Sequence, residues 1–243
     1  MRAAAAMIQV ATCLLAAAVP LQAPRSSLQL ARAPMLLIPE FQYPDRTPPP
    51  TSMQWVGLFE ARGGYELRSA QVTLAPINEC GETDRAARQI TVAGPSQPIL
   101  IVQAHHPSLP RWRLGPLGPA IGRTGIAPGD HRDIRTRSGV FRLAASGSGS
   151  GGNVYEYALR LIDRRTGISQ LLFAYTPPPG APRELHQSPY LVWMGDLDRD
   201  GRADLLVEDA MSEIAEHWVL YLSSAARGRN LVGRVAEFER GSC

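Results

Sequence analysis

The chain has 243 residues, of which 44% are hydrophobic and 19% charged, and its formal net charge is +3. All 25 basic residues are arginine, and they are scattered without the runs or interleaved aromatic residues that nucleic-acid-binding surfaces show. Nucleic acid is therefore not expected as a partner. No long apolar segment follows residue 19, so a membrane span is not expected either.

The N-terminus has the pattern of an export signal. Arg2 supplies a short basic start, and residues 3–19 are apolar, uncharged and too short and alanine-rich for a comfortable membrane span. Residues 1–23 are therefore predicted to be a signal peptide, cleaved near Ala18 or Ala23. The mature protein is expected in the periplasm or outside the cell.

Loss of the signal removes Cys13 and leaves two cysteines, Cys80 and Cys243. An even pair in an exported chain is typical of a disulfide bond. This bond would tie the last residue of the chain to its first half by closing a loop of about 160 residues. Two free thiols are the alternative.

Prolines recur in residues 24–54, which are expected to be extended, although residues 35–38 can still lie against the core. Residues 55–243 are predicted to form a single β-rich domain. Alternating or continuous apolar patterns bounded by turn residues predict its strands. The predicted strands are residues 55–59, 65–74, 89–93, 99–102, 140–144, 154–162, 168–175, 190–194, 203–207, 217–222 and 231–238.

Three segments interrupt this series of strands. Residues 105–133 contain so many prolines and glycines that they are expected to form the longest loop. The Ser/Gly tract at residues 146–152 is either a linker between two small β subdomains or the tip of a long hairpin. Residues 211–216 can form one or two helical turns. The short strands predict an all-β fold, an antiparallel sandwich or barrel.

The most informative motif is an acidic loop at residues 196–204. Gly201 at loop position 6 permits a sharp turn, and the carbonyl group of Arg202 at position 7 would supply a main-chain oxygen. Alternating carboxylates on such a loop can direct their oxygens at one Ca²⁺ ion, which prefers six to eight oxygen ligands. The carboxylates fall at positions 1, 3, 5 and 9: Asp196, Asp198, Asp200 and Asp204.

The flanks of the loop predict two strands and not the helices of a helix-loop-helix calcium hand. Position 12 is Val207, where such a hand has a bidentate Glu, and Glu208 is expected to be a surface acid. Residues 195–207, GDLDRDGRADLLV, resemble the calcium loop of FG-GAP/VCBS-type repeats. The resemblance covers about residues 193–209 in a single copy, whereas such repeats come in tandem. It implies a strand-loop-strand calcium turn with the four aspartates and the Arg202 carbonyl as ligands; an acidic turn without metal is the alternative.

Catalytic patterns are sparse along the rest of the chain. Asp130, His131 and Asp133 lie within the predicted long loop and are the candidate acid/base group of a hydrolase. Trp112 lies between two arginines in the same region and is the aromatic candidate for contact with a protein or glycan ligand. The sequence favours an exported binding or structural module of unknown partner, with calcium in a structural role. A secreted or periplasmic hydrolase with a calcium-stabilised fold is the alternative.

Overall fold

The computed structural model describes residues 34–39, 42–43, 52–76, 88–150, 153–175, 189–209 and 215–241. The predicted signal peptide, Cys80, Cys243 and residues 211–214 lie outside the described residues, so export and the disulfide bond stay predictions. The described strands are β1 (Leu36–Leu37), β2 (Gln42–Tyr43), β3 (Trp55–Ala61), β4 (Gly64–Ala70), β5 (Val72–Pro76), β6 (Arg88–Val92), β7 (Leu100–Gln103), β8 (Gly115–Pro116), β9 (Thr124–Gly125), β10 (His131–Thr136), β11 (Gly139–Ser150), β12 (Asn153–Asp163), β13 (Ser169–Ala174), β14 (Tyr190–Gly195), β15 (Asp204–Asp209), β16 (Ala215–Leu222) and β17 (Gly233–Gly241), with a 3₁₀ helix, η1 (Ser223–Ala225), after β16.

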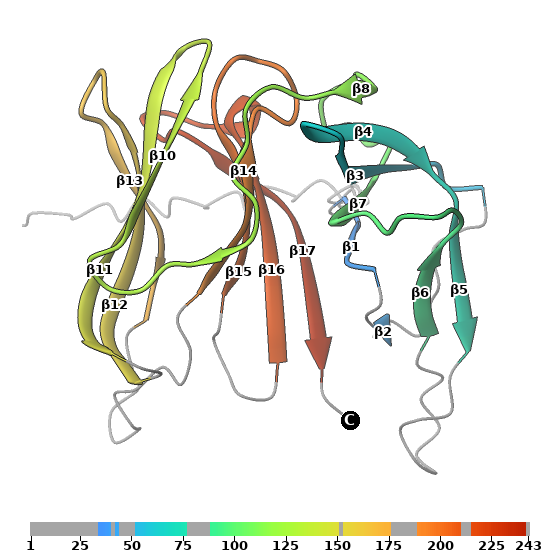
Figure 1. Cartoon of the computed structure of the whole chain (residues 1–243), viewed down its shortest axis with the longest axis horizontal. Helices are drawn as coiled ribbons and strands as arrows, with labels where there is room; N and C mark the ends of the chain where they lie inside the picture. Colours follow the sequence, from blue (N-terminus) through green and yellow to red (C-terminus); the bar gives the residue numbers. More distant parts are fainter. Residues whose placement is uncertain are drawn as a thin grey trace, which may run out of the picture. The chain divides into compact units, whose positions relative to one another are not determined.

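The strands form four antiparallel sheets, which confirms the all-β prediction (Figure 1). The central sheet has the order β17-β16-β15-β14-β9, and the meander sheet has the order β10-β11-β12-β13. The N-terminal sheet has the order β1-β7-β3-β4-β8, and a small sheet has the order β2-β6-β5. None of these sheets closes into a barrel within the described residues, so of the two predicted forms the packed sheets are found.

The central sheet is covered on both faces. Because successive side chains of a strand point to opposite faces, Trp193 and Leu206 enter the core shared with the N-terminal sheet. Met194 and Leu205 enter a second core, which the meander sheet completes. All four side chains are fully buried. This double burial explains the apolar runs at residues 191–194 within β14 and 205–207 within β15, and the sequence predicted both segments as strands.

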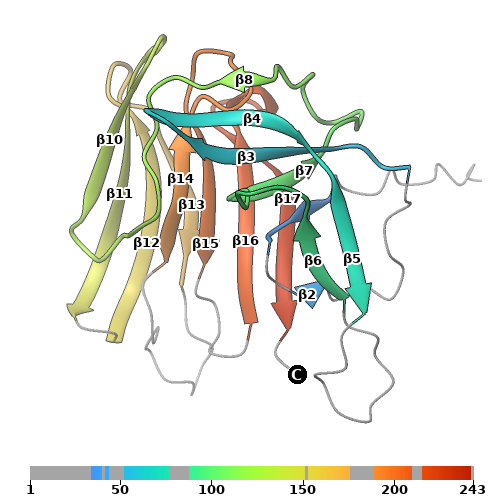
Figure 2. The ribbon, with the colours of Figure 1, turned by 45° about the vertical axis from the view of Figure 1, so that its right-hand side comes forward.

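The predicted hairpin of residues 154–162 and 168–175 is present as β12 and β13 (Figure 2). β11 runs into the Ser/Gly tract as far as Ser150 and pairs with β12, so this part of the tract belongs to a hairpin. Upstream, β1 pairs with β7, and Leu36 and Leu37 are buried in the first core, as the sequence allowed.

Three structural predictions differ from the structure. Residues 105–133 are not one loop, because they contain β8, β9 and the start of β10. Glu208 is not a surface acid, since it is buried at 7% exposure and forms an ion pair of 2.6 Å with Arg123. Residues 215 and 216 belong to β16 and not to a helix. Within the described residues no helix has the length and apolar character needed to cross a bilayer.

Candidate metal centre

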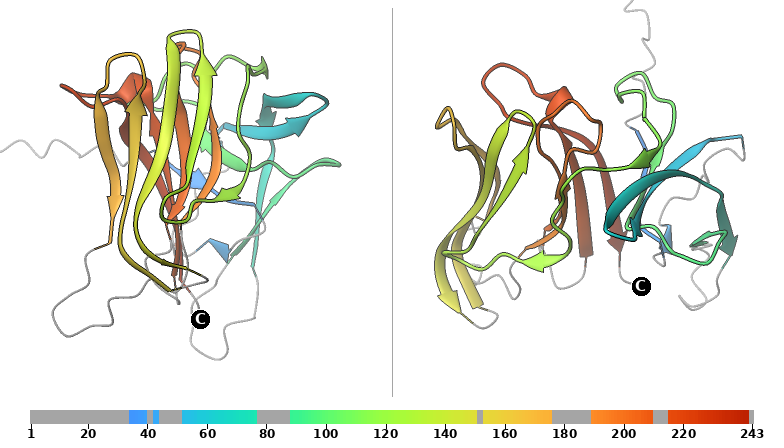
Figure 3. Two further views of the ribbon diagram at one scale, coloured as in Figure 1. Left: turned by 60° about the vertical axis from the view of Figure 1, so that its left-hand side comes forward. Right: turned by 45° about the horizontal axis from the view of Figure 1, so that its top comes forward.

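The acidic loop connects β14 to β15, and Gly195 and Asp204 at its two ends lie directly opposite each other in the sheet. The strand-loop-strand prediction is confirmed for this segment. The loop lies at the same end of the strands as β8 and the turn between β10 and β11 (Figure 3). That turn holds the loop, because the Ser138 N–H group donates to the Gly201 carbonyl at 2.9 Å and Arg137 donates to the Arg199 carbonyl at 2.9 Å.

Hydrogen bonds between the aspartates and backbone N–H groups curl the loop. Gly201 donates to Asp196 Oδ2 at 3.1 Å, Asp200 donates to Asp198 Oδ1 at 3.2 Å, and Arg202 donates to Asp200 Oδ1 at 2.7 Å. Short polar side chains favour this kind of turn because they bond to backbone groups a few residues away. Gly201 has a φ of 95°, which only glycine adopts without strain, as predicted for the sharp turn.

Asp204 organises the loop from the inside. The residue is fully buried, and its Oδ2 atom accepts hydrogen bonds from the N–H groups of Leu197 at 2.7 Å and Asp198 at 3.2 Å. Its Oδ1 atom accepts from the N–H group and the hydroxyl group of Ser223, at 2.7 and 2.9 Å. A single carboxylate therefore joins the start of the loop to η1.

Two serines of η1 complete the surroundings of the carboxylates, and the sequence did not predict them. The Ser223 hydroxyl also donates to Asp200 Oδ2 at 2.8 Å, and the Ser224 hydroxyl donates to Asp198 Oδ2. No sequence spacing links these serines to the acidic loop, because β15, the segment after it and β16 lie between them. Only the antiparallel return of β16 to the loop end of β15 brings them close.

The structure brings three of the predicted ligands together. One carboxylate oxygen from each of Asp196, Asp198 and Asp204 lies within 4.8 Å of the other two. Asp196 Oδ1 is buried, and it has no hydrogen-bond partner among the residues that the structure describes. Asp200 is exposed and lies outside this group, while the Arg202 side chain points to solvent, as expected for a residue that would contribute only its carbonyl group.

Burial and mutual repulsion act against the charges of these carboxylates. Burial raises the pKa of Asp204 well above its ordinary value, and the nearby Asp198 carboxylate adds to the shift. Burial is also the largest cause that raises the pKa of Asp196 and of Asp198, and the Asp200 charge contributes to both. A cation among these oxygens would offset this repulsion.

The acid/base candidate of the sequence is not assembled in the structure. His131 is exposed at the start of β10, and it has no hydrogen bond to a carboxylate within the described residues. Asp130 accepts from the Ala127 N–H group at 3.0 Å. Arg142 binds Asp133 through two hydrogen bonds of 2.7 Å, which lower the pKa of that carboxyl.

Trp112 is held as a structural residue. Its side chain packs against the first core, and its indole N–H group donates to the Gln103 carbonyl at 3.2 Å. These contacts occupy the polar edge of the ring and part of its apolar surface. They do not favour the predicted contact with a protein or glycan ligand.

The central sheet carries a second group of charged residues, which was not predicted from the sequence. His217 Nδ1 lies 2.9 Å from Asp209 Oδ2, which is on the neighbouring strand, and His217 Nε2 lies 3.2 Å from Glu237 Oε2. Arg234 also pairs with Glu237 and lies 3.3 Å from His217 Nε2. The hydrogen bond to Asp209 is the largest of the causes that raise the pKa of His217. Three strands contribute these residues, so no local motif could reveal them.

Comparison with models of known protein families, with curated proteins and with solved structures gave no match. The assignment of a role to the acidic loop therefore depends on its geometry.

Proposed function

We propose that the protein is an exported calcium-binding β-protein in which one Ca²⁺ ion, held by the acidic loop, stabilises the fold. Asp196, Asp198 and Asp204 would provide carboxylate oxygens, with Asp200 and the Arg202 carbonyl group completing the set. The ion would act on stability and not on a reaction.

The observation that carries the proposal is Asp196 Oδ1. This oxygen is buried and has no hydrogen-bond partner among the described residues. The Asp196 carboxylate to which it belongs is one of the three that each have an oxygen within 4.8 Å of the other two. Leaving a buried charged acceptor unsatisfied is costly, and native proteins rarely do so without a reason. A cation bound to Asp196 Oδ1 would supply the missing interaction.

The chemistry of the ligands supports calcium over softer metals. All the candidate ligands are oxygen atoms, and no histidine or cysteine belongs to the group of carboxylates that the structure brings together. Hard cations prefer such oxygen sets, whereas zinc and copper prefer nitrogen and sulfur. An irregular loop also suits the flexible coordination of Ca²⁺ better than the strict octahedron of Mg²⁺.

Thermal unfolding in calcium and in chelator tests the proposal. Extracellular calcium modules bind in the range of about 10⁻⁴ to 10⁻³ M, and the loop lacks a bidentate Glu at position 12. At a hundredfold excess over the dissociation constant, binding to the native state stabilises it by about 2.7 kcal/mol. For a chain of this size, that corresponds to a rise of roughly 5–10 °C in melting temperature.

Single substitutions distinguish calcium binding at the acidic loop from a general effect of negative charge on the melting temperature. Asp198→Ala removes a predicted ligand and should abolish the rise in melting temperature, as should Asp196→Ala. Glu239→Ala removes an exposed carboxylate from β17 and should leave the rise intact. If calorimetry detects no binding and calcium at about 10–100 mM, a hundredfold excess over the expected dissociation constant, leaves the wild-type melting curve where chelator leaves it, the loop is only an acidic turn.

A further inference from the structure

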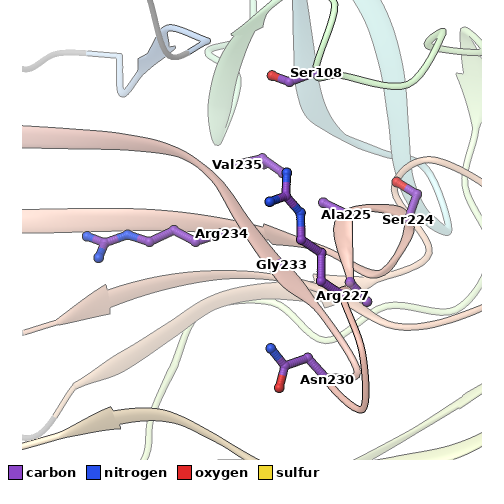
Figure 4. Close-up of a pocket in the computed structure, with 9 residues that line it drawn as sticks. Ser108, Ser224, Ala225, Arg227, Asn230, Gly233, Arg234 and Val235 are labelled. Atoms are coloured by element: carbon purple, nitrogen blue, oxygen red, sulfur yellow. The ribbon is translucent and has the colours of Figure 1, made fainter. Parts of the chain in front are cut away.

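A groove of about 590 Å³ opens beside η1, on the surface between that segment and the start of β17 (Figure 4). It does not include the three clustered aspartates, and none of the described residues that line it is acidic. Its lining residues come from three segments: Ser108, Ser224 to Arg227 with Asn230, and Gly233 to Val235.

The two walls of the groove are in direct contact at Gly233. A side-chain Cβ atom at this position would lie 2.2 Å from the Ala225 carbonyl oxygen, so only glycine permits β17 to pass so close to η1. The Asn230 N–H group donates to the Arg227 carbonyl at 3.1 Å, which closes a turn. These contacts form the groove without help from a ligand.

The groove presents unused hydrogen-bond donors and positive charge. The Arg234 guanidinium is paired with Glu237, but the Arg227 guanidinium has no hydrogen bond or ion pair within the described part of the chain. The side-chain amide of Asn230 likewise has no partner there. Figure 4 shows the Arg227 side chain extending toward Val235, while the Arg234 guanidinium points elsewhere.

We propose that this groove binds an oxyanion group, with Arg227 as the anchoring cation. A guanidinium presents a planar set of donors that matches the two oxygens of a carboxylate, phosphate or sulfate. Because no carboxylate of the described residues competes for Arg227 in the groove, an anionic ligand meets a charge that those residues do not neutralise. The expected ligand is thus an acidic small molecule, or a larger polar molecule that carries an acidic group.

Titration of the full chain with inorganic phosphate, and separately with citrate, tests the proposal. The readout is the arginine Nε–H signals in NMR spectra, at constant ionic strength and on protein freed of metal and then of chelator by dialysis, so that the outcome does not depend on calcium. We expect a saturable shift of the Arg227 signal. The probe with the lower dissociation constant shows whether the groove prefers phosphate or a carboxylate.

The matched control is Arg229, which is exposed in the same turn but does not line the groove. Losing a charged hydrogen bond weakens binding by about tenfold or more, so Arg227→Ala should raise the dissociation constant by that factor. Arg229→Ala should change it less than twofold. A shift that grows linearly without saturation, or an equal loss in the two variants, overturns the proposal, because either result means general screening of surface charge.

Discussion

Asp204 tests whether the acidic loop is held by its own hydrogen bonds or only by a cation. Its carboxylate accepts from two buried N–H groups, those of Leu197 and Ser223, and from the N–H group of Asp198 at the edge of the loop. Asp204→Ala removes the acceptor while the donors stay in place. The metal-free variant should therefore be less stable than the metal-free wild type.

The size of this loss follows from two opposing effects. A buried N–H group that loses its acceptor costs about 1–3 kcal/mol, and Asp204→Ala leaves two such groups. The raised pKa of Asp204 shows that burial and Asp198 destabilise its charge. Removing that charge therefore offsets part of the loss in the free energy of unfolding. We expect a net loss of about 2 kcal/mol, the lower part of the range.

Urea unfolding in chelator measures this difference. Asp200→Ala is the control, because Asp200 is exposed and, among the described residues, accepts from one backbone N–H group and the Ser223 hydroxyl. It should lower the free energy of unfolding by less than about 1 kcal/mol. Asp204→Ala should lower the midpoint without changing the slope of the transition. A metal-free Asp204→Ala variant as stable as the wild type would refute the reasoning, since charge burial would then outweigh the hydrogen bonds.

Two further predictions concern the central sheet. The raised pKa of His217 means that protonation stabilises the folded state fully below pH 6.5, and that this contribution is lost as the pH rises through the folded-state pKa. Asp209→Asn removes the largest cause of the shift, so melting temperatures measured from about pH 6 to about pH 9 should depend less on pH in this variant. Gly195→Ala places a Cβ atom 2.4 Å from the buried Trp193 ring, and denaturant unfolding should show a loss of about 1–3 kcal/mol. Gly118→Ala, which meets no atom within 4 Å, should show almost none; an equal loss in the two variants would contradict the crowding at residue 195.

Most of the longer strands could be predicted from the sequence because the patterns that indicate a strand are local. Continuous apolar runs such as residues 190–194 and 203–207 can be recognised without knowing their neighbours, and they correspond to β14 and β15. The strands within residues 105–133 were harder to predict, since proline and glycine are frequent in the segment and β8 and β9 have only two residues each. Strands this short exist because a neighbouring strand supplies their hydrogen bonds, and sequence patterning does not show that neighbour.

The acidic loop was predicted as a set of residues, but its surroundings were not. Ser223 and Ser224 reach the carboxylates only through the pairing of β15 with β16, which places the end of one strand beside the start of the other. His217 and Asp209 meet for the same reason, as a directly opposed pair in that register. Cross-strand neighbours depend on register, and register is a property of the folded sheet.

The position of the β14–β15 hairpin connects the fold to the chemistry proposed for the loop. Both strands are covered on both faces, so the loop between them begins and ends inside the protein, and Asp204 at the start of β15 is fully buried. A hairpin at the surface of a two-layer sandwich would leave the same aspartates in water, where their repulsion is weak. Here burial raises the pKa of Asp196, Asp198 and Asp204, and one buried oxygen of Asp196 has no hydrogen bond from the part of the chain that the structure describes. The central place of the hairpin thus turns a common acidic turn into a group of carboxylates that a divalent cation would stabilise.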